Sequence, residues 1–394
     1  MRDMVGQLAR RLLRRWGVAR GVMVLLVAIL LAGATSAWLL ATEHRESSPA
    51  GAFEPRELAL WPMTAARAAE LRHAALQRAQ VRIAAPSRPV FDLDVIEPPL
   101  DCHFIPREPS GTSPKFDCVL DGGDVVKVKY GRNPEVPGEV AATRLLSALG
   151  FPADRMTIAR SVRCYGCPRS PFVAMHILRL TGVDAWYSAP GRAEGYSEFG
   201  WAAVERKFEA APIELNDRKG WGWWELKVVD PLAGASRTDL DALRLVAVFL
   251  AHWDNKDENQ RLACLDEPGA PDAACARPIA MVQDLGATFG PTKVNVARWA
   301  SLPVWADRST CTVSMKNLPF GGGTFPDARI GEEARRQVAT QLSSIPRADV
   351  RALFAAARFP EYYSSTADDK DLSRWEAAFT DRVRQIAAAG PCPQ

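Results

Sequence analysis

The sequence predicts an α+β protein of two lobes, a small antiparallel sheet lobe followed by a mostly helical lobe, behind an N-terminal transmembrane helix. Three observations lead to this prediction: an uncharged run near the N-terminus, two β-branched segments around a glycine turn, and helical segments in the second half. The 394 residues are 47% hydrophobic and 24% charged, which is enough to bury a sizeable core. The net charge of +3 sits mostly at the N-terminus. We therefore expect no nucleic-acid partner.

The N-terminal segment predicts the compartment. Residues 21–41 are uncharged and match the roughly 20 residues that a membrane-spanning helix needs. Residues 1–20 are basic and should stay in the cytoplasm, so the main domain should be periplasmic or otherwise extracytoplasmic. A cleaved signal peptide is the alternative, because residues 32–37 (AGATSA) are small. The apolar run continues through Trp38, Leu39 and Leu40, which favours an uncleaved single-pass anchor.

The eight cysteines agree with an oxidising compartment, where an even number favours disulfides. Sequence neighbours suggest the pairs Cys102 with Cys118, Cys164 with Cys167, Cys264 with Cys275 and, by remainder, Cys311 with Cys392. Cys164 and Cys167 could instead form half a zinc site or a redox pair. No second CxxC or histidine pair stands at ligand spacing, which favours the disulfide.

The segment before the first lobe, residues 42–100, is expected to be a linker with a juxtamembrane helix over residues 64–81. The first lobe should span residues 101–182 and begin with strands at 116–120 and 125–130. Between them, Asp121-Gly-Gly-Asp124 is typical of a hairpin turn.

Helical and strand patterns continue along the chain. Residues 137–150 predict a helix that stops at Gly150, and residues 156–180 a further pair of strands. The second lobe should span residues 183–394. It contains a buried helix that starts at Thr238 as N-cap, with Asp241 three residues on, and further helices over residues 331–359 and 371–388.

The buried helix leads into an unusually polar stretch, HWDNKDENQR, residues 252–261. It has the form H-x-D-x-K-x-x-N, with every functional position of the H-R-D-L-K-x-x-N loop of protein kinases filled. Twenty-five residues after Asn259, an apolar run ends in Asp284-Leu-Gly286, as a D-F-G segment does. A strand lysine and a helix glutamate lie upstream, in the order that the kinase fold requires.

The chain therefore resembles the atypical protein-kinase-like superfamily, and within it the HipA-type kinases, the spore-coat kinase CotH and the secreted casein-phosphorylating kinases. Residues 110–116 (SGTSPKF) resemble a short G-x-x-P-K phosphate loop, which implies that Gly111 and Lys115 bind nucleotide. The resemblance covers about residues 101–289. It implies a two-lobed kinase-like fold and an ATP-dependent phosphotransferase.

Lys127 and Lys129 lie on the same face of their strand and compete for the phosphate-binding role. In the kinase fold the residue two before this lysine covers the adenine and must be compact and apolar. Val125 meets that requirement for Lys127, whereas Lys127 itself would stand there for Lys129. We therefore predict Lys127, paired with Glu139 on the following helix and with Glu135 as the fallback partner.

The resemblance also implies the remaining roles. Asp254 would accept the proton of the acceptor hydroxyl, and Lys256 would offset charge on the transferred phosphoryl group. Asn259 and Asp284 would hold Mg²⁺ or Mn²⁺, while His252 would brace the loop. The acceptor is a protein or a small molecule.

Two questions remain open at this level. Asp257 and Glu258 are either solvated charges or extra metal ligands. A catalytically inactive nucleotide-binding or protein-binding module on the same scaffold is the alternative function.

Overall fold

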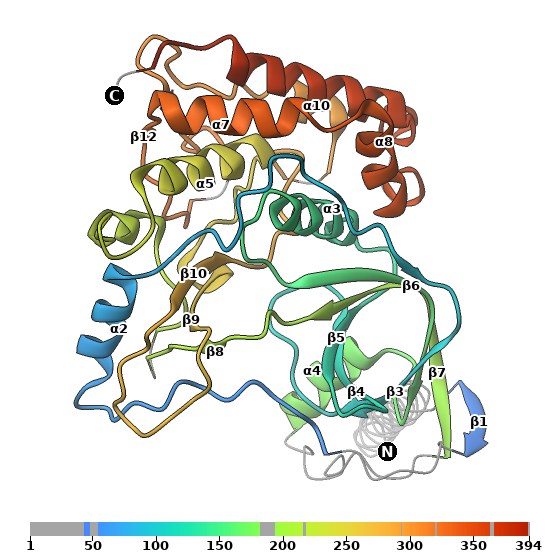
Figure 1. The fold of residues 1–394 in the computed structure, drawn as a ribbon. Coiled ribbons are helices and arrows are strands. Elements are labelled where there is room, and N and C mark those ends of the chain that lie inside the picture. The colour runs from blue at the N-terminus through green and yellow to red at the C-terminus, as the bar shows by residue number, and fades with distance from the viewer. Residues whose placement is uncertain are drawn as a thin grey trace, which may run out of the picture.

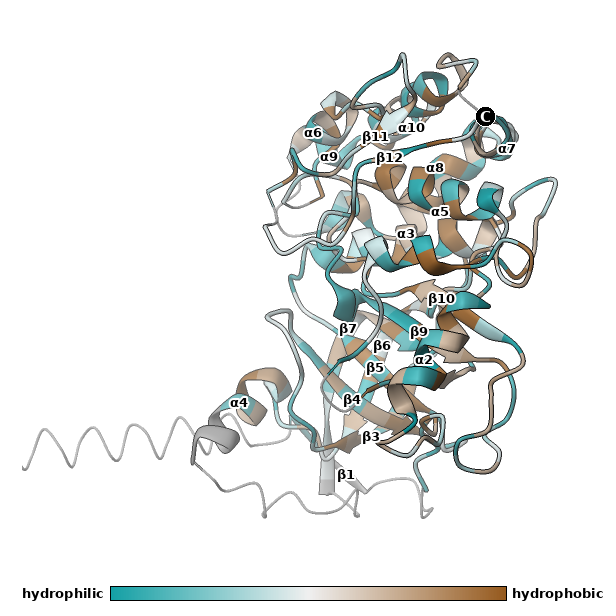
Figure 2. Cartoon of the chain, turned by 90° about the vertical axis from the view of Figure 1, so that its left-hand side faces the viewer, coloured by the Kyte–Doolittle hydropathy of each residue, from teal (hydrophilic) through white to brown (hydrophobic). Residues whose placement is uncertain are grey.

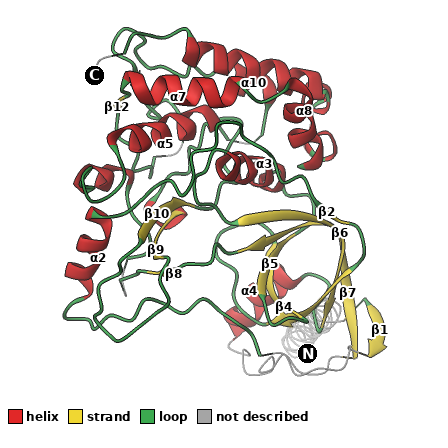
Figure 3. Ribbon diagram, in the orientation of Figure 1, coloured by secondary structure: helices red, strands yellow, loops and turns green. Residues whose placement is uncertain are grey.

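The computed structural model describes residues 43–47, 54–181, 194–215, 218–292, 294–319, 321–362 and 366–392. It is a mixed α/β structure (Figures 1 and 3). The predicted basic segment 1–20 and membrane span 21–41 lie outside the described residues. Among the residues that are described, no helix is both long and apolar enough to cross a membrane.

The first half of the chain forms a seven-stranded sheet with the order β1-β7-β5-β4-β3-β6-β2. Its strands are β1 (His44–Ser47), β2 (Val95–Ile96), β3 (Leu100–Ile105), β4 (Lys115–Leu120), β5 (Val125–Lys129), β6 (Arg155–Tyr165) and β7 (Glu194–Arg206). Because β7 pairs with β6 as well as with β5, the strands from β3 to β7 close into a ring, which Figure 3 shows as a curled sheet. The predicted hairpin is confirmed as β4 and β5.

The sheet differs from the prediction in three respects. It is mixed and not purely antiparallel, because β6 runs parallel to β2 and β3. The second predicted strand of residues 156–180 is a helix, α4 (Pro171–Thr181), which follows the extended β6. The sheet also continues through β7, past the lobe boundary that was predicted at residue 182. The apolar pattern of the residues that form α4 fits a short helix as well as a strand, so the pattern alone could not distinguish the two.

A second, smaller sheet and the helices make up the rest of the fold. The small sheet has the order β10-β9-β8, with β8 (Ala211–Pro212), β9 (Gln260–Cys264) and β10 (Pro278–Val282); β11 (Thr312–Val313) pairs with β12 (Ala328–Arg329). The helices are α5 (Arg237–Leu250), α6 (Val296–Ser301), α7 (Glu332–Ser343), α8 (Arg347–Ala356), α9 (Ala367–Lys370) and α10 (Leu372–Ala387). Three short 3-10 helices join them: η2 (Trp223–Val228), η3 (Asp257–Asn259) and η4 (Phe359–Glu361).

Helix α5 is the centre of the helical part. Its N-cap is Ser236, whose hydroxyl accepts a hydrogen bond from the backbone N–H of Asp239, so the helix starts two residues before the position predicted for Thr238. Both Ser236-x-x-Asp239 and Thr238-x-x-Asp241 are near capping boxes, and the sequence alone did not separate them. Figure 2 shows hydrophobic residues along α5, which α7 and α10 cover on the outer side in Figure 1.

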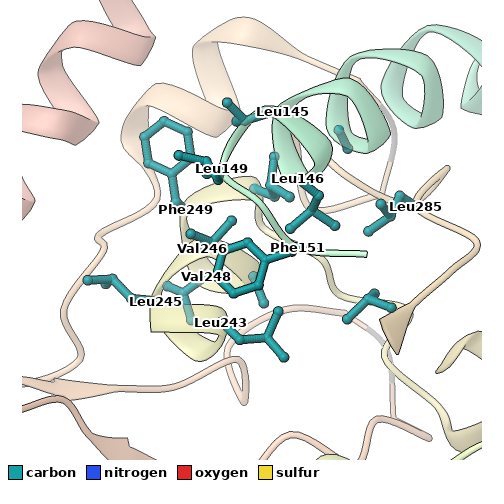
Figure 4. Close-up of a cluster of buried hydrophobic side chains, with 14 of the residues drawn as sticks. Leu145, Leu146, Leu149, Phe151, Leu243, Leu245, Val246, Val248, Phe249 and Leu285 are labelled. Atoms are coloured by element: carbon teal, nitrogen blue, oxygen red, sulfur yellow. The ribbon is translucent and has the colours of Figure 1, made fainter. Parts of the chain in front are cut away.

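Helix α3 (Glu135–Ala148) lies between the ring of strands and the helical part. Figure 4 shows Leu145 and Leu149 of α3 next to Phe249 of α5, within one buried apolar cluster that also contains Leu285. The interior of the ring holds a separate core, which includes Phe104, Phe116, Val126, Val128 and Phe199. Burial of α3 between two parts of the molecule links the sheet to the helices.

The helix predicted within residues 64–81 is present as α2 (Ala68–Gln77), but it is not a free spacer. Arg72 on α2 forms a buried ion pair with Glu225 of η2, with 3.0 Å between Nη1 and Oε1. The backbone N–H of Gln80, just after α2, donates to the carbonyl of Pro278 on β10. This segment is therefore packed onto the second half of the chain.

All four predicted disulfides are confirmed. They join Cys102 to Cys118, Cys164 to Cys167, Cys264 to Cys275 and Cys311 to Cys392. The first two lie in the sheet part and the others in the second half of the chain. Cys164 and Cys167 are therefore a disulfide and not half of a zinc site.

Candidate functional site

A cleft of about 900 Å³ is lined by residues from the ring of strands and from the small sheet. Eight site residues were predicted from the sequence, and all but Asp254 line this cleft. The seven are Gly111, Lys115, Lys127, Glu139, Lys256, Asn259 and Asp284. They come from five separate segments of the chain, which the fold brings together. Charged side chains dominate the lining, with eight basic and six acidic residues.

The ion pair that was predicted for Lys127 is formed by Lys129. The Nζ atom of Lys129 lies 2.5 Å from Oε1 of Glu139 and 3.0 Å from Oε2 of Glu205. All three side chains are buried. Lys127 lies farther out on the same strand, and its nearest acidic partner is Glu205 at 3.8 Å.

The reason for this difference lies in chain connectivity. Only residues 130–134 connect the end of β5 to the start of α3, so Glu139 in the second turn of α3 meets the last residue of the strand. Lys127 instead pairs across the sheet with Glu205 on β7. The requirement for an apolar residue two positions before the lysine selected the wrong partner for Glu139.

The charges around Lys129 reinforce one another. Burial alone would lower the pKa of Lys129, but Glu139 and Glu205 outweigh it and raise that pKa well above its usual value. Burial would likewise raise the pKa of Glu205, but Lys129 and Lys207 hold it well below normal. Lys129 is therefore a charged, fixed ammonium in the cleft.

A chain of buried ion pairs extends from Glu205 to the opposite wall. Glu205 binds Lys207; Lys207 binds Asp154, with 2.8 Å between Nζ and Oδ2; and Arg261 on β9 binds Asp154 at 3.3 Å. Sequence reasoning missed Glu205 and Lys207 because it predicted no strand over residues 194–206. The apolar run Ala202-Ala203-Val204 directly before Glu205 was the available signal.

The loop before β4 provides a second lysine. Lys115 is buried, and it forms no hydrogen bond or ion pair with any residue that the structure describes. A Cβ atom at position 111 would lie 3.5 Å from its Nζ, and Gly111 has a positive φ of 74°. The fallback residue Glu135 accepts a hydrogen bond from Ser113 in the same loop, so the loop is attached to the start of α3.

Burial lowers the pKa of Lys115, and the neighbouring charge of Lys129 lowers it further. An anion bound here would offset both effects. Lys115 and Lys129 therefore form a basic pair in the cleft, as expected for a site that binds phosphate groups.

The polar loop after α5 is held in place by Asn255. Its Nδ2 donates to the carbonyl of His252 at 3.0 Å, and its Oδ1 accepts from the backbone N–H groups of Thr324 and Phe325. His252 is fully buried, which lowers its pKa to about 4 and keeps the ring neutral near pH 7. Neither ring nitrogen forms a hydrogen bond in the described part of the chain, so His252 packs inside the loop.

Asp254 is half-buried beside the cleft. Burial raises its pKa, Lys256 and Asn259 oppose that shift, and the charge of Asp284 adds to it. Its Oδ1 atom is buried and has no hydrogen-bond partner in the described structure. A hydroxyl group would satisfy this acceptor. Because the charge of Asp284 affects the pKa of Asp254, the two carboxylates lie close enough to interact electrostatically.

Asn259 and Asp284 both present oxygen atoms to the cleft. The Nδ2 of Asn259 donates to the carbonyl of Asp254 at 2.6 Å, which turns the amide and leaves its Oδ1 free of hydrogen bonds to described residues. The carboxylate of Asp284 forms no hydrogen bond or ion pair with the described residues either. Burial would raise the pKa of Asp284, but Lys129 and Lys115 outweigh it and lower that pKa.

Asp257 and Glu258, whose roles the sequence left open, have basic partners. Asp257 binds Arg218, with 2.9 Å between Oδ2 and Nη2. Glu258 binds Lys256 at 3.3 Å and is largely exposed. Each of these two carboxylates therefore has a basic partner at the cleft.

The backbone at Asp284 is strained and tightly packed. Asp284 has a φ of 51°, in the left-handed region that residues with a side chain seldom adopt. A Cβ on Gly286 would lie 2.8 Å from the Cβ of Glu135, and a Cβ on Gly138 would lie 3.1 Å from the carbonyl oxygen of Gly286. These two glycines allow α3 and the Asp284 segment to touch, which sets Glu139 against Asp284.

No protein-family model and no curated protein matches the chain. Among solved structures, the chain is similar to the Helicobacter pylori proinflammatory kinase CtkA, with 12% sequence identity and a TM-score of 0.38 over 74% of this chain and 97% of that chain. Similarity this weak does not assign an activity. The functional proposal therefore depends on the geometry of the cleft.

Proposed function

We propose that this protein is a kinase-like phosphotransferase, which moves the γ-phosphoryl group of ATP to a hydroxyl group on a protein or small molecule. One observation supports this above all others. Lys115, the Lys129–Glu139 ion pair, Asn259 and Asp284 come from five different elements or loops and line one cleft. Phosphoryl transfer depends mainly on positioning and on charge stabilisation, which such a set supplies.

The residues fit a divalent cation. Asp284 offers a carboxylate without a partner in the described structure, and Asn259 offers an amide oxygen. Mg²⁺ and Mn²⁺ prefer oxygen ligands, and Mg²⁺ commonly uses one or two protein ligands together with water and phosphate oxygens. A bound cation would neutralise negative charge on the phosphates.

Each remaining side chain has a role that follows from its surroundings. Lys115 and Lys129 would bind phosphate oxygens, while Glu139 and Glu205 keep Lys129 in position. Asp254, with its unpaired Oδ1, would accept the proton of the acceptor hydroxyl. Lys256 is charged because Asp254 and Glu258 outweigh burial and raise its pKa, and it would offset charge on the transferred group.

We further propose that the protein is anchored by residues 21–41 with its main domain outside the cytoplasm. The four disulfides support this placement, because disulfides persist in oxidising compartments. Alkaline phosphatase fused after Gln394 should be active in a bacterial host. An inactive fusion together with an active cytoplasmic reporter at the same position would exclude this topology.

Two substitutions test the proposed chemistry. Asp284→Ala should abolish Mn²⁺-dependent ATP binding, measured by isothermal titration calorimetry. Asp254→Asn should leave ATP binding nearly unchanged but reduce transfer by about 100-fold or more, since a general base typically contributes 10²–10⁴-fold. Transfer is measured with radiolabelled ATP.

Lys316→Met is the control, because Lys316 pairs with Asp327 on an exposed surface and does not line the cleft. Wild-type transfer by both cleft variants would disprove the proposal. ATP binding that responds to Asp284→Ala, without transfer by the wild type to any acceptor, would favour an inactive nucleotide-binding module.

A further inference from the structure

The lining of the cleft offers few surfaces on which a nucleobase could bind. Small-molecule sites are mostly apolar, and the flat faces of a base need apolar or aromatic walls. Among the described residues that line the cleft, only Leu58 and Pro212 carry an apolar side chain. Aromatic side chains are absent from this described lining.

A series of ion pairs runs along the cleft from Glu205 on β7 to Arg261 on β9. Arg261 on β9 and Asp154 are buried and paired, and Lys207 connects Asp154 to Glu205. A base placed against this chain would remove water from charged groups without forming new hydrogen bonds to satisfy them. Desolvation of charges is costly when nothing replaces the water.

The backbone that joins the ring to the small sheet is already hydrogen-bonded at Phe208. Its N–H donates to Oδ1 of Asp154 at 2.8 Å. Its carbonyl accepts from Nη2 of Arg261 at 3.0 Å and from the N–H of Ala210 at 2.9 Å. The polar edge of a base would therefore find neither a free donor nor a free acceptor at this residue.

In contrast, the cleft has side chains that suit phosphate groups and a cation. Lys115 is a buried ammonium without a partner among the described residues, beside Gly111 and near Lys129. Asn259 and Asp284 line the same cleft and supply oxygen atoms for a cation. Binding energy for a donor is thus concentrated where its phosphates and their metal would lie.

We propose that this cleft recognises its phosphoryl donor through the phosphate chain and not through a base, so that a base-free condensed phosphate such as tripolyphosphate also serves as donor. This inference rests on the proposed phosphotransferase function. The acceptor oxygen forms a bond to the terminal phosphorus as the bond from that phosphorus to its bridging oxygen breaks. Pyrophosphate leaves with the electron pair, and the hydroxyl proton passes to Asp254.

Binding of several donors at one buffered concentration of free Mn²⁺ tests the proposal on the full-length chain. Tripolyphosphate, ATP, GTP and CTP should bind within about threefold of one another by calorimetry, whereas adenosine should not bind. A recognised base would instead favour ATP by about tenfold or more, equivalent to the roughly 1.4 kcal/mol that a few neutral hydrogen bonds or a stacked ring contribute.

Two variants sharpen the comparison. Lys115→Met should weaken ATP and tripolyphosphate by the same factor, about tenfold or more for one lost charge-assisted contact. It should not lower the Tm of the free protein, because it removes a buried charge without a partner among the described residues. Leu58→Ala removes a partly exposed apolar side chain from the lining and should change neither affinity.

The outcomes separate this inference from the proposed function. ATP binding at least tenfold tighter than tripolyphosphate, or a loss of ATP affinity alone in Leu58→Ala, would overturn base-independent recognition but leave the phosphotransferase proposal standing. If neither ATP nor tripolyphosphate bound, both proposals would fail. Transfer of radiolabelled phosphate from tripolyphosphate to the acceptor that ATP labels would extend the binding result to catalysis.

Discussion

Lys127 and Lys129 are two positions apart on one strand but have different electrostatic surroundings. Lys129 lies between two buried carboxylates, Glu139 and Glu205, whereas the side chain of Lys127 is partly exposed and reaches only Glu205. The first arrangement fixes an ammonium at a defined place in the cleft. The second is a peripheral charge with a weaker and more easily screened interaction.

The two lysines make a matched pair for mutation. Lys129→Met should weaken donor binding roughly 10- to 100-fold, because hydrogen bonds to charged groups contribute about 1.5–3 kcal/mol. Lys127→Met should weaken binding by less than about fivefold, as expected for a partly exposed charge. Calorimetry with ATP and Mn²⁺ measures both.

A stability measurement accompanies this test, because Lys129→Met leaves Glu139 buried beside an apolar side chain. Breaking a buried ion pair costs about 3–5 kcal/mol, and Lys129→Met/Glu139→Met should recover much of that stability without recovering binding. Equal effects of Lys127→Met and Lys129→Met on affinity would show that the ion pair does not select the phosphate-binding lysine.

At the scale of elements, helix termini hold the candidate site in place. Helix α5 ends at Ala251 in the left-handed conformation, and the polar loop begins at the next residue. The buried guanidinium of Arg382 on α10 donates to the carbonyls of Val248 and Phe249 at the end of α5, and to those of Trp299 and Leu302 at the end of α6. It satisfies carbonyls that a helix end leaves open and complements the negative end of each helix dipole.

A second helix terminus predicts an effect of pH on stability. Glu332 at the start of α7 accepts hydrogen bonds from Arg335 and from the backbone N–H of Cys392, and these lower its pKa to about 2. A carboxyl group with a lowered pKa stabilises the fold above its unfolded pKa of about 4.5 and loses that contribution as the pH falls toward 2.

We expect Glu332→Gln to lower the Tm at pH 6 by a difference on the order of 2 °C. The gap between variant and wild type should narrow between pH 4.5 and 2, because protonation removes the same charge from the wild type. Scanning calorimetry of both proteins across this range measures the difference. A gap that stayed constant down to pH 2 would show that the charge of Glu332 is not responsible. Glu333→Gln on the same turn is a suitable control.

At the scale of the whole molecule, α3 packs between a closed ring of strands and a helical part. The disulfides within these parts close chain loops of very different length. The Cys311–Cys392 disulfide connects residues 81 positions apart and ties the C-terminus to the segment before α7. The Cys164–Cys167 disulfide spans only three positions within the sheet part. Loop-closure entropy predicts different contributions from the two.

Removal of each disulfide by paired serine substitutions tests this difference. By the chain-entropy relation, Cys311→Ser/Cys392→Ser should lower the free energy of unfolding by about 4.5 kcal/mol, and Cys164→Ser/Cys167→Ser by about 1.6 kcal/mol. Guanidinium unfolding monitored by tryptophan fluorescence gives both values. A larger loss from the short-range pair would mean that loop closure does not dominate the effect.

The sequence by itself determined the features that depend on local patterns and short spacing. The hairpin of β4 and β5, the helix at α3, the polar loop after α5 and the four disulfides all follow from residues that are neighbours or are marked by their chemistry. The motif H-x-D-x-K-x-x-N and Asp284 also pointed to the cleft that the fold assembles. Such signals survive folding because side-chain periodicity, turn chemistry and cysteine content are set along the chain.

Only the tertiary structure decided which charged residues meet. Lys129 and not Lys127 pairs with Glu139, because the short connection after β5 brings α3 to the end of the strand. Glu205, Asp154 and Arg261 meet through pairings across the ring and the small sheet, over separations that no sequence pattern encodes. Electrostatic energy depends on distance and burial in space, and for residues more than a hundred positions apart the fold alone sets both.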